Sequence, residues 1–492
     1  MSATTTPKNG PVSAVDQAAS APSMVRPAAD RRTDAPTVMD GPVVIVGAGV
    51  TGLVTAQLLA EAGVEVVVIE KLPQLGGLAR SFVYDDQYVF DCGPHRFDTN
   101  NPNIKTYLER VLTRPGTFYA RKSEVYFKGK YYAWPIKPQN LTQLPPRLAG
   151  RAFVDLAVNG YKEYGEDNFE NYILRQYGPT LYKHFFEGYS MKFLQLHPSE
   201  THSDWAKVGI NRAIIDDNAQ MQNLGQLLRS TLMQFNKVPQ RFLYPQAGMY
   251  EAWDNVADAI KAKGGRVILG QGAEMIGDGK RVVEVRAGGE SFSPSVVVWT
   301  APITLACDQL DLHVPDLQYL GLLLYNVIVR EEAPRDYQWC YYGARDLLIN
   351  RVSVPKFFSP DTTAPGVTGY CNEVTCMVGD ARWNHGERLI DWVIDDMVRV
   401  GLVRDRGNVA DVHVERLAES YPIYRKDYPV ELEKARSQLN QFENLRLAGR
   451  TGLFWYNNMD HSMENAMQLS RRLLQEAGMN DIDESKLAAG LN

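Results

Sequence analysis

The chain has 492 residues, of which 45% are hydrophobic and 22% are charged. This composition is typical of a soluble globular protein, and the length predicts two or three domains. A net charge of −6 argues against a general nucleic-acid-binding protein. No uninterrupted apolar run reaches the roughly 18 residues that a membrane span needs, so we expect no membrane partner.

Residues 1–40 are rich in Ala, Thr, Pro, Ser and Asp and contain no apolar segment typical of a secretory signal. We expect a disordered tail there. The five cysteines are scattered, and Cys371 and Cys376 lack the CxxC spacing of a zinc site. Free thiols in a reducing compartment follow, and we expect a cytoplasmic protein.

The stretch from Val43 to Glu70 has the order of a buried strand, a glycine turn, a helix and a second parallel strand. Gly47 permits the tight turn, Gly49 lets the backbone approach a pyrophosphate, and Gly52 lets helix and sheet pack closely. Glu70 ends the second strand, where an acid accepts ribose hydroxyls. A glycine turn without function is the alternative, but the flanking elements favour dinucleotide binding.

Gly76, Gly77 and Arg80 follow soon after the second strand. They would bring further backbone N–H groups and a guanidinium to the same pyrophosphate, although this segment alone is equally compatible with a plain turn. A strand at Val83–Phe90 and a rigid turn come next. His95, held in that turn between a Gly-Pro pair and an aromatic residue, is a candidate site residue.

The rest of the chain alternates helices and strands. We expect helices at Ile104–Leu112, Leu148–Tyr164, Phe169–Phe186, Asn223–Phe235, Tyr250–Lys263, Glu387–Val400 and His461–Gly478. We expect strands within Glu124–Trp134, Gly265–Leu269, Glu274–Arg286, Ser295–Thr300, Leu320–Val329, Leu347–Val354, Gly369–Val374 and Leu445–Arg450. The dense aromatics of the first of these favour core packing over a wall for a flat ligand. The final strand, turn and helix offer a second helix N-terminus to a cofactor.

From residue 41 onward the chain resembles the two-domain FAD proteins that include amine oxidases, protoporphyrinogen oxidase and, most closely, UDP-galactopyranose mutase. Two motifs are particular to the mutases. Gly93–Asn100 resembles their Gly-Pro-His-x-Phe-His-Thr-Asn turn, and Gly449–Asp460 resembles their Gly-Arg-x-Gly-x-Tyr-x-Tyr-x-Asp-Met-Asp motif.

The resemblance implies an α/β fold, with a Rossmann-like FAD-binding domain and an inserted, partly helical substrate domain that has a mixed sheet. We expect residues 41–110, 236–312 and 410–480 in the FAD-binding domain and residues 111–235 and 313–409 in the substrate-binding regions. A homodimer is compatible with the resemblance.

The resemblance also implies an isomerase that uses reduced FAD without net redox change. In this family N5 of the flavin attacks the anomeric carbon of a nucleotide-activated hexopyranose and displaces the nucleoside diphosphate. The sugar ring of the covalent adduct then opens and recloses as the furanose. The expected partner is a nucleotide-diphosphate sugar.

The motifs also imply the residues of the site. Those expected near the ADP half of FAD are Gly47, Gly49, Val50, Thr51, Gly52, Glu70, Lys71, Gly76, Gly77, Leu78, Ala79 and Arg80. Those expected toward the isoalloxazine are Pro94, His95, Gly449, Arg450, Asn458, Met459 and Asp460. His95 would lie near N5, and Tyr456 would face the sugar or the diphosphate.

Departures from the family pattern affect the diphosphate. Phe454 replaces a tyrosine, Asn458 an aspartate and Asp98 a histidine, and the segment that supplies a substrate-clamping arginine has no counterpart. Because a buried diphosphate still needs cations, either a divalent metal or other basic side chains would serve; the candidates are Arg212, Arg351 and Lys192.

These departures favour a different nucleotide-sugar, and the branch most resembled acts on GDP-L-galactose in bacterial nucleoside-antibiotic biosynthesis. Both UDP- and GDP-sugars stay open. An amine- or protoporphyrinogen-oxidase-like oxidoreductase is the alternative and predicts an apolar tunnel, whereas the mutase predicts a cationic pocket. A non-catalytic flavin-binding scaffold is the third alternative.

Overall fold

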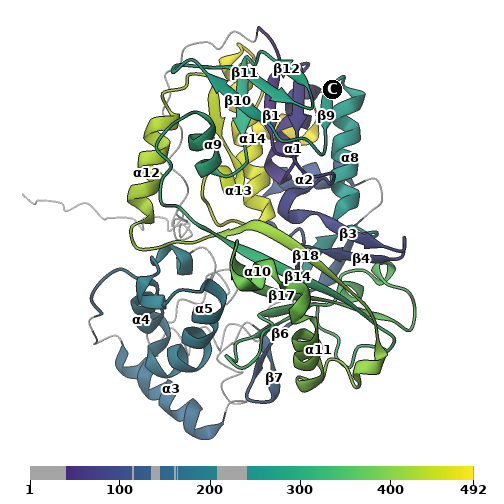
Figure 1. Ribbon diagram of the computed structural model, residues 1–492, viewed down its shortest axis with the longest axis vertical. Coiled ribbons are helices and arrows are strands. Elements are labelled where there is room, and N and C mark those ends of the chain that lie inside the picture. The colour runs from purple at the N-terminus through teal and green to yellow at the C-terminus, as the bar shows by residue number, and fades with distance from the viewer. Residues whose placement is uncertain are drawn as a thin grey trace, which may run out of the picture.

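The computed structural model describes residues 40–112, 116–134, 145–159, 162, 164–207 and 241–490. Residues 1–39 of the expected tail and the expected helix at Asn223–Phe235 lie outside these ranges. Within them, the chain forms a parallel sheet with helices at one end and a second, mixed sheet with a helical region at the other (Figure 1).

The first sheet has five parallel strands in the order β19-β13-β1-β2-β9. Their bounds are β1 Val43–Val46, β2 Val66–Ile69, β9 Arg266–Ile268, β13 Val296–Trp299 and β19 Leu445–Leu447. Continuous β-branched runs in β1, β2 and β13 are buried throughout, as in a sheet covered on both faces. Helix α1 (Val50–Glu61) packs against α8 (Met249–Ala262) and α14 (Met459–Glu476).

The second sheet has seven strands in the order β18-β14-β17-β16-β15-β6-β7. Their bounds are β6 Ser123–Phe127, β7 Lys130–Trp134, β14 Tyr319–Val329, β15 Trp339–Tyr342, β16 Arg351–Ser353, β17 Thr368–Met377 and β18 Val409–Pro422. Strands β15 and β6 pair in parallel, and the other neighbours pair antiparallel. The sheet is therefore mixed, as predicted.

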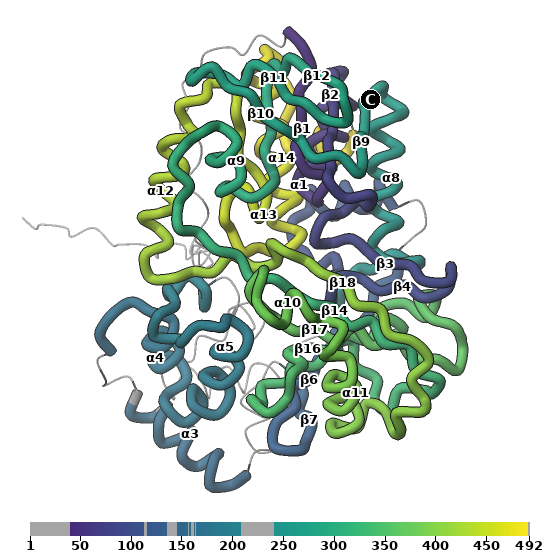
Figure 2. The backbone as a smooth tube through the Cα atoms, viewed as in Figure 1, coloured from purple at the N-terminus to yellow at the C-terminus, as the bar shows by residue number. Residues whose placement is uncertain are grey.

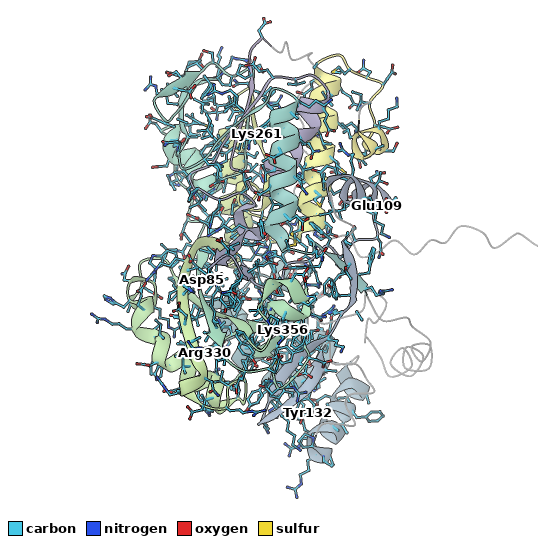
Figure 3. All side chains as sticks on the ribbon, turned by 90° about the vertical axis from the view of Figure 1, so that its right-hand side faces the viewer. Asp85, Glu109, Tyr132, Lys261, Arg330 and Lys356 are labelled. Carbon is cyan, nitrogen blue, oxygen red and sulfur yellow. The ribbon has the colours of Figure 1, made fainter. Side chains whose placement is uncertain are left out.

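Strand β18 carries the chain from the second sheet back toward the first (Figure 2). We expected residues from 410 onward in the dinucleotide-binding domain, but β18 pairs with β14 along almost its whole length. The chain enters the five-stranded sheet again only at β19. Tyr132 of β7 and Lys261 of α8 lie near opposite ends of the molecule (Figure 3).

A helical region packs beside the second sheet. It contains α3 (Pro146–Asn159), α4 (Phe169–Leu181), a π-helical turn (Tyr182–Phe186) and α5 (Glu187–Leu194). The helix that we expected to run unbroken over Phe169–Phe186 is kinked. Gly178 has a φ of +73° and precedes Pro179, which has no N–H to continue the helical bonds.

The remaining α-helices and β-strands lie outside the two large sheets and the helical region. They are β3 Ser81–Tyr84, β4 Tyr88–Asp91, α2 Pro102–Val111, β5 Thr117–Ala120, β8 Arg241–Tyr244, β10 Glu274–Gly277, β11 Val282–Ala287, β12 Glu290–Phe292, α9 Ile303–Gln309, α10 Ala381–Asn384, α11 Ile390–Arg399, α12 Tyr428–Leu439, α13 Gly449–Gly452 and α15 Glu484–Ala489. All five cysteines are buried and none is in a disulfide. Within the described ranges, the chain has no helix with the length and apolar character of a membrane span.

Candidate functional site

The glycine turn between β1 and α1 has the conformation that its sequence predicts. Gly47 has a φ of +105°, which favours glycine, and its N–H donates to the Ile69 carbonyl at 2.8 Å. A Cβ added at Gly52 would lie 2.0 Å from the Gly47 carbonyl oxygen. Close packing of α1 on the turn therefore requires glycine at position 52.

Gly49 is different, because the fold itself does not demand a glycine there. Its φ of −76° suits any residue, and the nearest atom to an added Cβ is the Gly77 Cα at 3.9 Å. Gly76 binds the same turn, donating its N–H to the Ala48 carbonyl at 2.8 Å. The backbones of Gly49 and Gly77 thus lie side by side at the N-terminus of α1. We call this place the cradle, and the residues present there fit a dinucleotide pyrophosphate.

Glu70 closes one side of this cradle. Its carboxylate accepts hydrogen bonds from the N–H groups of Ala48 at 2.8 Å and Leu72 at 2.9 Å. These bonds fix the carboxylate beside the turn, where it retains acceptor capacity for a ribose hydroxyl. Lys71, which we expected near the cofactor, is exposed, and its ammonium lies 3.6 Å from the Glu419 carboxylate of β18.

The segment after Gly76 forms a short 3₁₀ turn at Gly77–Ala79 that contains Leu78. The Ala79 carbonyl accepts from the Trp253 indole at 2.8 Å, which ties the turn to α8. Arg80 donates to the Gly77 carbonyl at 2.8 Å, while its buried Nε has no hydrogen-bond partner in the described part of the chain.

The C-terminal strand, turn and helix meet the first glycine turn. Gly449 has a φ of +75°, and its N–H donates to the Asn465 amide oxygen at 3.0 Å. Thr51, which with Val50 begins α1, donates its hydroxyl to the Ser462 carbonyl at 3.2 Å. The N-termini of α1 and α14 therefore lie together.

Helix α14 begins two residues earlier than we expected. Asn458 precedes its first turn, and the Asn458 N–H donates to the His461 imidazole at 3.4 Å. Met459 and Asp460, both buried, form the start of the helix. All three predicted residues therefore belong to this helix N-terminus.

His95 follows the Gly93-Pro94 turn predicted to flank the cofactor. Gly93 has a φ of +91°, and its carbonyl accepts the His95 N–H at 2.8 Å. The pKa of the imidazole is lowered to about 3, first by burial and then by three guanidinium groups, those of Arg351, Arg450 and Arg96. His95 is therefore neutral at physiological pH, and its buried Nδ1 has no hydrogen-bond partner among the described residues.

Arg351 forms a buried ion pair that the sequence did not predict. Its guanidinium donates to both carboxylate oxygens of Glu373, at 2.6 and 2.7 Å, and to the Tyr421 hydroxyl at 3.2 Å. Glu373 is completely buried on β17, directly opposite Arg351 on β16. The carboxylate offsets the charge that we expected Arg351 to offer to a diphosphate.

The Arg450 guanidinium stacks on a group of aromatic rings that includes Tyr456. The Arg450 Cζ lies 4.6 Å from the ring centre of Tyr456 and 4.9 Å from that of Tyr421. Tyr456 stacks on Trp205 with ring centres 4.8 Å apart. Two backbone carbonyls accept hydrogen bonds from the Arg450 guanidinium, whose pKa is lowered by burial.

A cavity of about 370 Å³ lies between the helical region and the second sheet, and Tyr456, Tyr421 and Arg351 all contribute to its wall. Among the described residues the wall is mostly aromatic and apolar, and Lys128 and Arg399 are its further Lys and Arg side chains. Further lining residues include Phe127, Trp134, Phe169, Phe185, Phe186, Tyr189, Phe193, Trp205 and Tyr341. This composition is more apolar than the cationic pocket predicted for a mutase.

Lys192, another predicted diphosphate ligand, is not among the residues that line this cavity. The Lys192 ammonium donates to the carbonyls of Tyr342, Ala344 and Ile349, at 3.0, 3.3 and 2.5 Å, and so holds the loop between β15 and β16. The strand expected over Leu347–Val354 is limited to β16, and its first residues belong to this loop. Arg212 lies outside the described residues. Within the described ranges, no group of three or more His, Cys, Asp or Glu residues could hold the divalent metal.

Glu373 and Tyr421 are residues that sequence reasoning missed. A signal for Glu373 was present, because its carboxylate lies within the strand that we expected over Gly369–Val374. Such a group needs a charged or hydrogen-bonding partner. Nothing local to Tyr421 indicated that it would meet Arg351.

Comparison with known proteins identifies the fold. Residues 45–111 match the family model of the NAD(P)-binding Rossmann-like domain. The structure is similar to the crystal structure of a reduced UDP-galactopyranose mutase, with a TM-score of 0.76 and 20% identity, over 92% of this chain and 96% of that one. The fold is that of a UDP-galactopyranose mutase. The α/β fold with a Rossmann-like domain is confirmed.

Two curated relatives are sugar mutases. The chain is 30% identical over 188 residues to a probable UDP-galactopyranose mutase of Klebsiella pneumoniae, covering 36% of this chain and 47% of that protein. It is 30% identical over 190 residues to the dTDP-fucopyranose mutase of Escherichia coli, covering 36% and 48%. The chain thus spans about half the length of the curated relatives it matches.

Oxidases also share part of the chain or the fold. Tryptophan 2-monooxygenase of Pseudomonas savastanoi is 33% identical over 119 residues, covering 23% of this chain and 20% of that protein. A putative protoporphyrinogen oxidase from Exiguobacterium sp. 255-15 has a TM-score of 0.69 at 16% identity, over 89% of this chain and all of that one.

Proposed function

We propose that the chain is a flavin-dependent nucleotide-sugar mutase that interconverts the pyranose and furanose forms of an NDP-hexose. Two observations support it: the glycine cradle of α1 and the N-terminus of α14 lie together in a fold like that of a mutase, and His95 lies close enough to Arg450 for that charge to lower the pKa of its imidazole. The sequence similarity to two sugar mutases supports the same reaction.

FAD is the cofactor that we propose for the cradle. The backbone of Gly49 and Gly77 and the N-terminus of α1 would hold its pyrophosphate, and Glu70 would bind a ribose. Arg80 brings a buried donor that lacks a protein partner in the described ranges. When bound and reduced, FAD supplies the nucleophile that displaces the nucleoside diphosphate from the sugar.

The chain's own residues would supply orientation and exclude water. His95 stays neutral, so its imidazole can donate or accept one hydrogen bond without carrying charge. Arg450, stacked between Tyr421 and Tyr456, places a buried cation near the same turn. The aromatic wall of the cavity would keep bulk water from the reacting sugar.

For the substrate, we propose a nucleotide-sugar of the UDP- or GDP-galactose type. Phe454 and Asn458 replace residues of the mutase motif, and this favours a substrate other than UDP-galactose. GDP-L-galactose is our first choice, as expected of an enzyme of nucleoside-antibiotic biosynthesis. The dTDP-sugars belong in the same test because one relative is a dTDP-fucopyranose mutase.

The mostly aromatic cavity favours a second candidate, an FAD-dependent oxidoreductase of the amine- or protoporphyrinogen-oxidase type. The two candidates differ in what turnover consumes. Once its flavin is reduced, a mutase gives a product that is an isomer of its substrate, and it consumes no oxygen. An oxidase consumes oxygen in step with turnover of an amine or a polycyclic compound. Product analysis by NMR with parallel oxygen measurement therefore separates them.

A further inference from the structure

Helix α3, in the helical region, exposes a row of apolar side chains. Phe153, Val154 and Val158 are 49%, 58% and 40% exposed, and Ala157 between them is exposed as well. Most of these positions are three or four residues apart, so the side chains lie on one side of the helix. A surface helix ordinarily turns such a row toward the core.

The opposite side of α3 already packs against the protein. Leu148 and Ala152 are buried in the core, and the Asp155 carboxylate accepts the Thr180 N–H of α4 at 2.8 Å. Helix α3 is therefore apolar on two sides, of which α4 covers one. The second apolar side indicates an interaction surface.

Two arginines share the exposed side with the apolar row. Arg147 and Arg151 are exposed and four residues apart, and Val154 and Val158 continue the same row along the helix. Among the described side chains on this side of α3, none is a carboxylate. The exposed side thus combines apolar groups with positive charge.

Further cations gather where α3 approaches the π-helical turn. Burial lowers the pKa of His184 in that turn, and the charges of Lys128, Lys183 and Arg151 lower it further. Within the described ranges, no carboxylate is among the charges that act on His184. We call Arg147, Arg151, Lys128 and Lys183 the basic cluster, and all four are exposed.

The cavity reaches the surface at the same place. Lys128 and His184 are exposed and also line the cavity, together with Gly129 at the tip of the hairpin formed by β6 and β7. Figure 1 shows α3 and this hairpin at the same end of the molecule. The apolar row, the basic cluster and the cavity mouth therefore belong to one end of the protein.

An anionic lipid bilayer fits this surface better than a second copy of the chain. A two-fold contact through α3 would bring two basic clusters to one interface, where like charges repel. A bilayer surface offers negative headgroups to the cluster and acyl chains to the apolar row. The net charge of the chain is −6, so the attraction is confined to this end.

We propose that α3 and the basic cluster dock the protein on an anionic lipid bilayer, with Phe153, Val154 and Val158 among the headgroups and the cavity mouth beside the bilayer. We expected no membrane partner because no segment could span a bilayer. A helix that lies on the bilayer surface needs no such segment. The inference goes beyond the proposed function and does not depend on it.

The test is cosedimentation of the full-length protein with lipid vesicles. We expect binding to vesicles of phosphatidylcholine mixed with phosphatidylglycerol, weaker binding to phosphatidylcholine alone, and loss of binding as salt rises. Phe153→Ser and Val154→Ser should each weaken the binding by roughly 5- to 30-fold. Arg151→Gln and Lys183→Gln should each weaken it by about 5-fold.

Matched controls come from exposed residues elsewhere. Val430 of α12 is 60% exposed, and Lys261 of α8 is exposed near the opposite end of the molecule from β7 (Figure 3). Val430→Ser and Lys261→Gln should leave vesicle binding unchanged. If Phe153→Ser does not fold, Val158→Ser tests the same side of α3.

Each remaining outcome counts against the docking surface. A wild type that stays in the supernatant with phosphatidylglycerol vesicles overturns the proposal, and so does binding that survives all four substitutions. Equal binding to both kinds of vesicle removes the role of the basic cluster and overturns it as well. Sedimentation velocity decides the other occupant: a wild-type dimer that Val154→Ser converts to a monomer would show that a second copy covers α3.

Discussion

Replacing Gly49 with alanine should weaken cofactor binding without harming the fold. The φ of −76° and ψ of 179° at Gly49 are allowed for alanine, and the new Cβ would lie 3.9 Å from the Gly77 Cα, an ordinary contact. Replacing glycine where the backbone suits alanine stabilises a protein by about 0.4–1 kcal/mol. The unfolding temperature of the apoprotein should therefore stay constant or rise slightly.

The effect on FAD should be opposite, because the same Cβ occupies space that the pyrophosphate needs. Overpacking a tight contact costs about 1–3 kcal/mol, which corresponds to roughly 5- to 150-fold weaker binding. Titration of apoprotein with FAD measures this directly. Gly52→Ala is the comparison, since its Cβ would lie 2.0 Å from the Gly47 carbonyl oxygen and should damage both fold and binding. Wild-type FAD affinity in Gly49→Ala would refute the assignment of the cradle.

Three further predictions concern buried charges. Glu373→Gln should lower the free energy of unfolding by about 3–5 kcal/mol, because Arg351 is left as a buried cation; urea denaturation showing a loss below 1 kcal/mol would contradict the ion pair. Burial lowers the pKa of Lys192 to about 7. Between about pH 7 and 10 Lys192 is therefore protonated in the unfolded chain but neutral in the folded one, and the free energy of unfolding rises with pH. Lys192→Met should lose about 2 kcal/mol of that rise between pH 7 and 9 in urea denaturation, and an unchanged pH dependence would show that Lys192 is not buried as described. Because the pKa of His95 is about 3, its ionisation should not affect kcat/KM between pH 5 and 8. His95→Asn should therefore lower kcat/KM without changing the shape of its pH profile. If the wild-type profile has a step near pH 6.5 that the variant lacks, His95 titrates there.

The dinucleotide-binding part of the fold was predictable because its signals are local. Glycine positions, a buried strand on each side and a terminal acid all lie within one short stretch, and β1, α1 and β2 occur where that pattern placed them. The Gly178-Pro179 pair also indicated a kink. The apolar periodicity of a helix continues across this pair, however, and so predicted an unbroken helix.

The features that the sequence did not indicate depend on contacts between distant segments. Strand β18 alternates polar and apolar residues as any half-buried strand does, so its sequence does not say which sheet it joins. Arg351 meets Glu373 only because β16 and β17 pair in one particular register. Lys192 was a reasonable cation for a diphosphate until three carbonyls of the β15–β16 loop were found around its ammonium.

The mutase proposal is tested most directly by anaerobic incubation of the dithionite-reduced, full-length protein with UDP-, dTDP- and GDP-hexoses, followed by NMR of the products. The account predicts that one nucleotide series gives a furanose isomer of its substrate, with no net oxidation and no activity before reduction. Failure to convert any nucleotide-sugar, together with oxygen consumption when an amine or a polycyclic compound is supplied, would contradict it and establish the oxidoreductase instead.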